Sequence, residues 1–288
     1  MKGNEKTRNI KMALFGYIMT LPAFLIILGI IVYPIINAII RSFQIQNEPG
    51  AYGFDNYIYL LTNNVARANI LYTLYVVVIT VILSTVIAFG LALYIRFGTS
   101  GFSKAVGALY LLPRFVPGLV AVNAMITVIR DNGLINRVAM SFGGSVSLGL
   151  MFTERGLILM NLWFNIPFAT MITLAALSGV QDNIIESARD AGAGKWTVFR
   201  RIILPLTMRD VMIAATFIFM GNVGSFSTPY LMGGNFPRMA GIALFDEFNK
   251  LRYERAAALS VVMFLMCLIS AVVYISTNMK KAKWETEH

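Results

Sequence analysis

Residues 180–210, VQDNIIESARDAGAGKWTVFRRIILPLTMRD, form a charged segment between two long apolar runs. At helical spacing, Ile184 and Ala188 fall on one face of a short helix. Gly-Ala-Gly at 192–194 interrupts that helix, and Pro205 ends a second amphipathic piece. The segment therefore predicts two short helices joined by a glycine turn, rather than an irregular polar loop.

Apolar runs flank this segment and recur along the whole chain. A helix that spans a bilayer needs roughly 20 apolar residues. The sequence has six such runs, and a charge, Arg114, interrupts only the third. A closed β-barrel is excluded because these runs do not alternate between apolar and polar residues. We predict an all-α integral membrane protein with one transmembrane domain, 12–279, and helices at about 12–40, 68–95, 105–129, 156–181, 211–232 and 256–279.

The composition agrees with a membrane protein and excludes several kinds of site. Of the 288 residues, 57% are hydrophobic and 13% are charged, about half the charged share of a soluble domain. The mean hydropathy is +0.70. The single cysteine, Cys267, excludes a disulfide framework, and the single histidine, His288, excludes a histidine-based zinc site. We therefore expect no catalytic residue and no bound metal on this chain.

The net charge of +10 is explained by membrane topology. With the N-terminus inside, most lysines and arginines fall in the N-terminal arm 1–11, in the segments 96–104 and 179–209, and in the basic tail 280–288. Cytoplasmic segments of membrane proteins carry such an excess. We expect both termini in the cytoplasm, with the positive charge facing the headgroups of the lipid bilayer and no nucleic acid as a partner.

The spacing within residues 186–205 resembles the signature loop of ABC importer permeases. In that family the pattern is Glu-Ala-Ala, three residues, Gly, nine residues, then Ile, any residue, Leu-Pro. Glu186-Ser187-Ala188, Gly192 and Ile202-Ile203-Leu204-Pro205 stand at these spacings, and only Ser187 departs from the pattern. The resemblance covers roughly residues 10–280, with a permease core at about 68–279. It implies a type I import permease, closest to the polyamine, phosphonate and ferric-ion group.

The resemblance also implies how the loop works and which partners the chain needs. The loop would be a coupling helix that docks in a cleft of a cytoplasmic ATPase subunit. Because the chain has no Gly-x-x-x-x-Gly-Lys-Ser/Thr phosphate loop, ATP and Mg²⁺ would bind to a partner ABC ATPase dimer, and this chain would carry no cofactor and not be an enzyme. The coupling residues, carried over by position, are Glu186, Ser187, Ala188, Gly192, Leu204 and Pro205.

Two further partners follow from the same resemblance. Six helices form half of a translocation pathway in this family, which implies a second permease subunit, a different but homologous chain. An extracellular solute-binding protein would deliver the solute. Importers of this type lie in the plasma (inner) membrane of prokaryotes as multi-pass proteins.

Polar residues within the apolar runs are the candidates for the pathway, because polar side chains at membrane depth face the bundle interior or a cavity. Hydrogen bonding between helices is the competing interpretation for each of them. Asn222 and Ser225 are favoured, since they stand three residues apart among glycines on one face of the fifth predicted helix. Asn165 and Asn123 complete the set, and Arg114 is expected to snorkel from the end of the third helix.

Two stretches bear on the solute. RDNGLINR at 130–137 and SFSTPYLMGG at 225–234 resemble external segments of the polyamine, phosphonate and ferric-ion permeases. An oligosaccharide or glycerol-phosphate type sugar permease is the alternative, although the sugar permeases' Thr-x-Gly-Gly-Pro pattern is missing. The lack of a carboxylate within the apolar runs argues against a polycation, which needs anionic or aromatic partners. A secondary transporter is a remote alternative, because it would show broken helices or intramembrane acids.

Overall fold

The computed structural model describes residues 2–46, 48 and 50–286, with side chains for 15–46, 48, 50–272 and 274–276. Residues 1, 287 and 288, and the side chains of the predicted arm 1–11 and tail 280–288, lie outside the described residues. The described chain is helical almost throughout and forms no β-strand, apart from an isolated bridge between Gln44 and Tyr52. The predicted all-α fold class is therefore confirmed.

The helical elements follow one another with short connections. In chain order they are α1 Lys2–Ile27, the π-helix η1 Leu28–Val32, α2 Tyr33–Ser42, α3 Asp55–Thr62, α4 Asn64–Phe97, α5 Gly101–Leu109, α6 Leu112–Phe115, α7 Gly118–Ile129, α8 Leu134–Ser141, α9 Glu154–Ser178, α10 Asp182–Asp190, α11 Lys195–Val198, the π-helix η2 Phe199–Ile203, α12 Leu204–Val223, α13 Ser227–Met232, α14 Ala240–Asn249 and α15 Tyr253–Thr286.

Six stretches of the described chain are long and apolar enough to cross a bilayer: Phe15–Ser42, Asn64–Phe97, Gly118–Ser141, Glu154–Ser178, Lys195–Val223 and Tyr253–Ser276. The third lies further along the chain than the sequence predicts, because Pro113 and Pro117 divide the run 105–129 into α5, α6 and α7. The fifth begins earlier, because the chain stays helical through Pro205, and it ends at Val223 rather than near 232.

The core of the fold is the pair α4 and α9, which pack along each other, with α12 against both and α15 against α12 and α2. Val76 and Val77 of α4 are fully buried against Leu157 of α9 and Val223 of α12. Alanines let the same helices approach closely further along, where Ala88 and Ala169 meet Ile218. This packing fixes the relative positions of the three helices that carry the candidate site.

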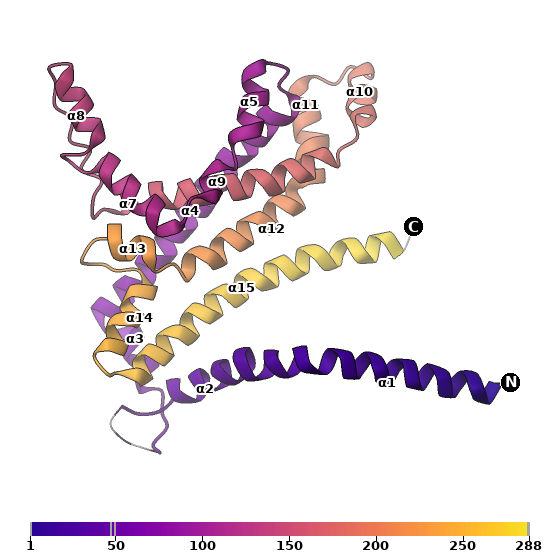
Figure 1. Cartoon of the computed structure of the whole chain (residues 1–288), viewed down its shortest axis with the longest axis vertical. Coiled ribbons are helices and arrows are strands. Elements are labelled where there is room, and N and C mark those ends of the chain that lie inside the picture. The colour runs from indigo at the N-terminus through magenta and orange to yellow at the C-terminus, as the bar shows by residue number, and fades with distance from the viewer. Residues whose placement is uncertain (1, 47, 49, 287–288) are drawn as a thin grey trace.

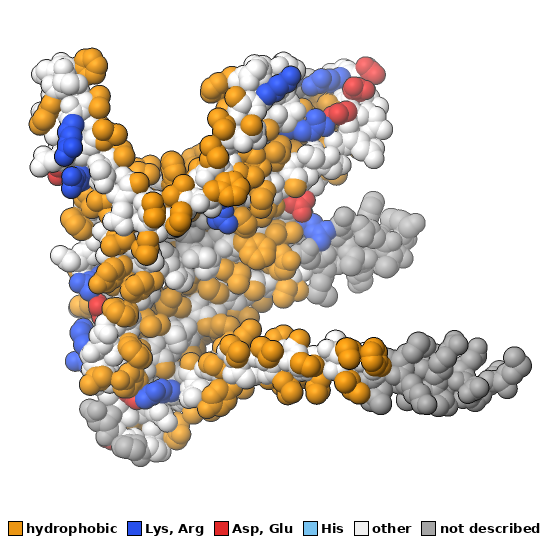
Figure 2. Space-filling view, viewed as in Figure 1, with side chains coloured by type: hydrophobic (Ala, Val, Ile, Leu, Met, Phe, Trp, Pro, Cys, Tyr) orange, Lys and Arg blue, Asp and Glu red, His pale blue; other side chains and the backbone are white. Residues whose placement is uncertain are grey.

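Within the first span, α1 stands away from this core (Figure 1), whereas α2 packs against α15. No residue in the most apolar window of Phe15–Ser42 is buried within the chain. Figure 2 shows hydrophobic side chains along this helix and over much of the visible bundle, with most charged side chains at the left edge and at the upper right, over α5, α10 and α11. So large an apolar surface requires lipid or another protein to cover it.

The ends of the chain lie on one side of the molecule. Figure 1 shows N, C and α10 toward the right, and α3, α8, α13 and α14 toward the left. A chain that crosses the membrane an even number of times must have both ends on the same side. The segment expected to be the coupling loop is therefore on the same side as both termini.

Candidate functional site

The predicted coupling loop folds as α10, a short helix that projects at one end of the molecule (Figure 1). Ile185 is buried on its inner face among Ala92, Leu177 and Val198, whereas Ile184 is exposed. The outward side presents Glu186 and Ser187 to the surroundings. The helix is therefore anchored by one apolar side chain and leaves its acidic side free for a partner.

An ion pair that sequence reasoning missed fixes the start of α10. The Arg96 guanidinium, at the end of α4, donates to a carboxylate oxygen of Asp182 at 2.7 Å. The two residues are 86 positions apart, so no local spacing could reveal the pair. Partly exposed pairs of this kind stabilise by about 0.2–1 kcal/mol, and this one links the start of α10 to the end of α4.

Gly192 ends α10 in a Schellman motif. The Gly192 N–H donates to the Arg189 carbonyl at 2.8 Å, and the Ala193 N–H donates to the Ala188 carbonyl at 2.9 Å. This pattern needs the residue after the helix to adopt the left-handed region, and Gly192 has φ of +84°. Ala188 and Ala193 then pack together on the cluster around Ile185. The small residues Ala188 and Ala193 and the glycine at 192 are thus explained by the turn that ends α10 and by its packing.

The second half of the loop, α11 and η2, runs into α12 without a break. The sequence-based expectation that Pro205 ends a helix is wrong: Pro205 lies in the first turn of α12, and the widened turn η2 precedes it. A π-turn can absorb the hydrogen bond that proline cannot donate. Phe199 of η2 stacks on Trp196 at 5.3 Å and meets Phe89 of α4 edge-on at 5.9 Å. The loop is therefore packed on α4 and continuous with α12.

Leu204 is half-buried at the start of α12, whereas Pro205 is exposed. Of the predicted coupling residues, Glu186, Ser187 and Gly192 are also exposed and Ala188 is half-buried. The loop thus combines an accessible outer side with firm attachments to α4, α9 and α12. Such a unit can transmit a displacement of α10 directly to the three spans that contain these helices.

Two of the predicted pathway residues lie together between α9 and α12. The Asn165 amide donates to the Asn222 side-chain oxygen at 3.3 Å, and Asn222 donates to the Ile218 carbonyl at 2.7 Å. Asn161 lies one turn before Asn165 and is 3% exposed, and its amide nitrogen has no hydrogen-bond partner within the described chain. These three asparagines form a polar line along α9 that meets α12.

The other two pathway candidates do not join this line. The expectation that Ser225 shares a helix face with Asn222 is wrong, because α12 ends at Val223 and Ser225 lies in the turn before α13. Asn123 is exposed on α7 and donates to the Leu119 carbonyl of its own helix. Arg114 lies on α6 with its guanidinium 5.3 Å from the Phe168 ring centre.

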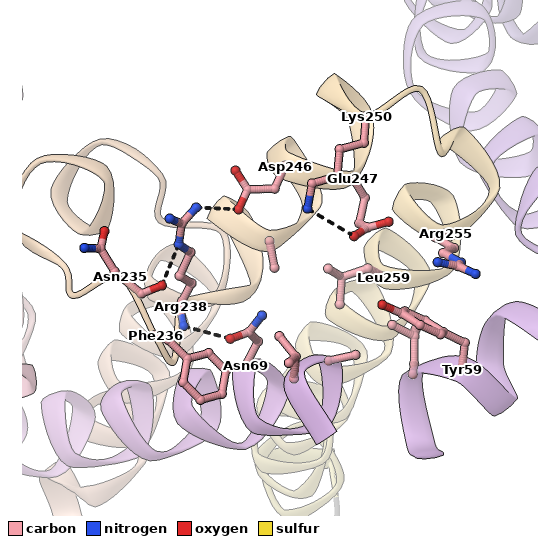
Figure 3. Close-up of a pocket in the computed structure, with 14 residues that line it drawn as sticks. Tyr59, Asn69, Asn235, Phe236, Arg238, Asp246, Glu247, Lys250, Arg255 and Leu259 are labelled. Atoms are coloured by element: carbon pink, nitrogen blue, oxygen red, sulfur yellow. Dashed lines mark hydrogen bonds and ion pairs between the residues drawn. The ribbon is translucent and has the colours of Figure 1, made fainter. Parts of the chain in front are cut away.

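The opposite end of the molecule carries polar residues that sequence reasoning did not assign. The Arg238 guanidinium donates to Asp246 at 2.6 Å and to the Asn235 carbonyl at 2.8 Å, as Figure 3 shows. Two buried residues of α4 hold this loop: Asn69 accepts from the Arg238 backbone at 2.8 Å, and the Thr73 hydroxyl accepts from the Ala240 backbone at 2.7 Å. The loop after α13 is thereby fixed to the core.

In the part of the chain that the structure describes, no three His, Cys, Asp or Glu side chains gather as a metal site would require. The described side chains therefore supply no set of metal ligands at either end of the molecule.

Comparison with known proteins gives a family and a fold. Residues 87–279 match the family described as binding-protein-dependent transport system inner membrane component. The chain is similar to the molybdenum transport system permease protein ModB of Azotobacter vinelandii, with 26% identity over 214 residues that cover 73% of this chain and 93% of that protein. It is also similar to the spermidine/putrescine transport system permease protein PotB of Haemophilus influenzae, 26% identical over 62% of this chain and 64% of that protein.

A solved structure with the same fold comes from a bacterial ABC transporter involved in the import of the acidic polysaccharide alginate. The two chains superpose with a TM-score of 0.79 at 20% sequence identity, and the match covers 97% of this chain and 99% of that one. The named solutes of these three proteins differ widely, so the similarity identifies a transport fold and not a solute.

Proposed function

Because the chain belongs to the family of binding-protein-dependent transport system inner membrane components, we propose that it forms half of the pathway of an ATP-driven importer, with residues 186–205 as the contact to the ATPase. It is a permease subunit of a type I ABC importer, a multi-pass inner-membrane protein and not an enzyme. The observation that carries the coupling proposal is α10 itself, whose outward side is exposed and whose base is attached to three spans.

The coupling proposal assigns a role to each part of the loop. Glu186 and Ser187 would contact the ATPase surface, and Gly192 would set the end of α10 through its left-handed conformation. Leu204 and Pro205 would pass the motion into α12 through η2. Nucleotide-driven closure of an ATPase dimer carrying ATP and Mg²⁺ would then tilt the attached helices as a rigid body.

The pathway proposal rests on the polar line between α9 and α12. Asn222 is 5% exposed and satisfied by Asn165 and its own helix in this conformation. A relative movement of α9 and α12 would separate the two amides and offer them to a solute. Polar side chains at membrane depth cost free energy unless they bind a solute or hold helices together.

The exposed first span supports the proposed partners. An apolar helix with no buried residue in its central window has surface for lipid on one side and for a second, homologous permease on another. An external binding protein would approach the opposite end, over α13 and α14. For the solute, sequence resemblance favours the polyamine, phosphonate and ferric-ion group, with sugars as the alternative, and the outer cavity described below favours the alternative.

Orientation and docking can be tested together by thiol labelling. Ser145 and Asp190 are both exposed, in the segment after α8 and on α10 respectively. In a Cys267→Ser background, an impermeant thiol reagent added to intact cells is expected to label Ser145→Cys and not Asp190→Cys. In inverted vesicles the order should reverse, and the copurified ATPase should protect Asp190→Cys. Labelling of Asp190→Cys in intact cells would contradict the proposed topology.

A further inference from the structure

A cavity of about 430 Å³ opens at the outer end of the molecule, between α13, α14 and the loop that joins them. Its lining combines the aromatic rings of Tyr72, Tyr230 and Phe245 with polar side chains from Asn235, Arg238, Asp246 and Asn249. Pockets for small molecules typically combine an apolar surface with a few convergent polar groups. The composition of the cavity is therefore suitable for a binding site at the entrance of the proposed pathway.

Three aromatic rings form a platform beside this cavity. Phe226 stacks on Tyr230 with ring centres 5.3 Å apart, and Phe245 meets Phe226 edge-on at 5.1 Å. Phe226 covers one side of Tyr230, yet Tyr230 remains 59% exposed. An aromatic face carries partial negative charge and attracts the partly positive C–H groups of a flat molecule. Tyr230 therefore offers a stacking surface that this chain leaves open.

The charges of the lining cancel each other. Its charged residues are Arg238 and Asp246, which form an ion pair at 2.6 Å. Figure 3 shows this pair, where the guanidinium also reaches the Asn235 carbonyl. A polycation would have to compete with Arg238 for the carboxylate, and an anion would have to compete with Asp246 for the guanidinium. The paired charges therefore favour a neutral solute.

The uncharged polar side chains of the lining can form hydrogen bonds with the hydroxyl groups of a solute. Asn235 and Asn249 are exposed, and both line the cavity. An amide both donates and accepts, which matches a hydroxyl group that does the same. Free oxygens of Asp246 and free N–H groups of Arg238 add further acceptors and donors of the same kind.

The cavity and the polar line described above lie along the same face of α9. Leu157, which lines the cavity, and Asn161 and Asn165 stand four residues apart on α9 and share one face of that helix. Asn161 is 3% exposed with a partnerless amide nitrogen. If α9 and α12 move apart as proposed above, a solute that leaves the cavity along this face would meet an amide group at each of the next two turns.

We propose that this outer cavity is a carbohydrate subsite, in which Tyr230 stacks on a sugar ring while Asn235, Asn249 and the Arg238–Asp246 pair bind its hydroxyls. The proposal rests on the permease function above and names its solute class. In this proposal the solute binds directly in the cavity as it enters the pathway.

The test is saturation-transfer NMR on the full chain in lipid nanodiscs, with maltotriose, spermidine and methylphosphonate as neutral, cationic and anionic probes. We expect saturation of the maltotriose ring protons, reduced roughly fivefold by Tyr230→Ala, since an aromatic contact contributes about that factor. Phe248→Ala is the matched control, because Phe248 is an exposed ring of α14 outside the cavity. It should leave the signal unchanged. Asn249→Leu, at an exposed position, should also weaken the signal.

Saturation of spermidine or methylphosphonate in place of maltotriose, no saturation of any probe, or an unchanged maltotriose signal in Tyr230→Ala would each overturn the carbohydrate subsite. Failure of the permease assignment is recognised separately, by the absence of an ATPase from the complex purified from cells. A chain that recruits its ATPase yet ignores maltotriose refutes only the subsite.

Discussion

Substitution of Gly192 by valine is expected to reduce solute-stimulated ATP hydrolysis and uptake to less than about a tenth of the wild-type rates, because a displaced contact at the core of an interface costs about 2 kcal/mol or more. Gly192 has φ of +84°, and a Cβ built on it would contact no other atom. The expected loss therefore comes from backbone strain and not from a clash. L-residues lose about 1–2 kcal/mol in this conformation, and a β-branched residue loses more.

The strain would be relieved by undoing the Schellman motif, which would move Ala193 from the cluster beneath α10 and change how α10 presents Glu186. Gly194→Val is the matched control, because Gly194 has φ of −68° and equally open surroundings. Proteoliposome uptake and ATPase copurification should separate the two variants. Wild-type transport by Gly192→Val, or equal loss in Gly194→Val, would contradict the assigned role of this glycine.

Replacement of Asn222 by leucine is expected to lower uptake about tenfold, because the Asn165 amide would lose its hydrogen bond across the α9–α12 contact and keep only its bond to the Asn161 carbonyl of its own helix. A hydrogen bond of this kind contributes about 0.5–1.5 kcal/mol, and its loss is expected to change how α9 and α12 are held together. Asn165→Leu should have a similar effect, and the double variant should be less impaired than the product of the two single effects, because the two amides act on each other.

Thr170→Val provides the control for the asparagine series. Thr170 is fully buried on α9, and its hydroxyl bonds only the Ile166 carbonyl of its own helix. Uptake by this variant should stay within about twofold of wild type, since it leaves no partner unpaired across helices. ATPase copurification should be normal in every variant. Full uptake by Asn222→Leu would contradict a pathway role for the asparagine pair and would indicate that it only holds the helices together.

The sequence predicts the number of spans, and the positions of all but the third and the fifth, because their signal is local. Runs of apolar residues and the spacing from Glu186 to Pro205 are visible without any tertiary contact, and the all-α fold follows from them. The glycine at 192 is likewise a local requirement of the turn that ends α10. These features depend on residues within a few positions of one another.

Features that depend on packing between distant segments could not be predicted. The Arg96–Asp182 pair joins residues whose spacing carries no signal. The sequence picks out Asn165 and Asn222 separately, yet their contact exists only because α9 and α12 pack together. The sequence pattern places Ser225 on the fifth helix, but α12 ends two residues earlier. The effect of Pro205 on the backbone depends on η2, which the sequence does not reveal.

The most direct test of the proposed coupling is site-specific photocrosslinking from α10 in intact cells. A photoreactive amino acid at position 187, on the exposed side of α10, is expected to give an adduct of this chain with an ABC ATPase subunit. The same amino acid at position 145, on the opposite side, should give none. An adduct at position 145 but not at 187, or no ATPase adduct at all, would contradict the assignment of residues 186–205 as the coupling loop.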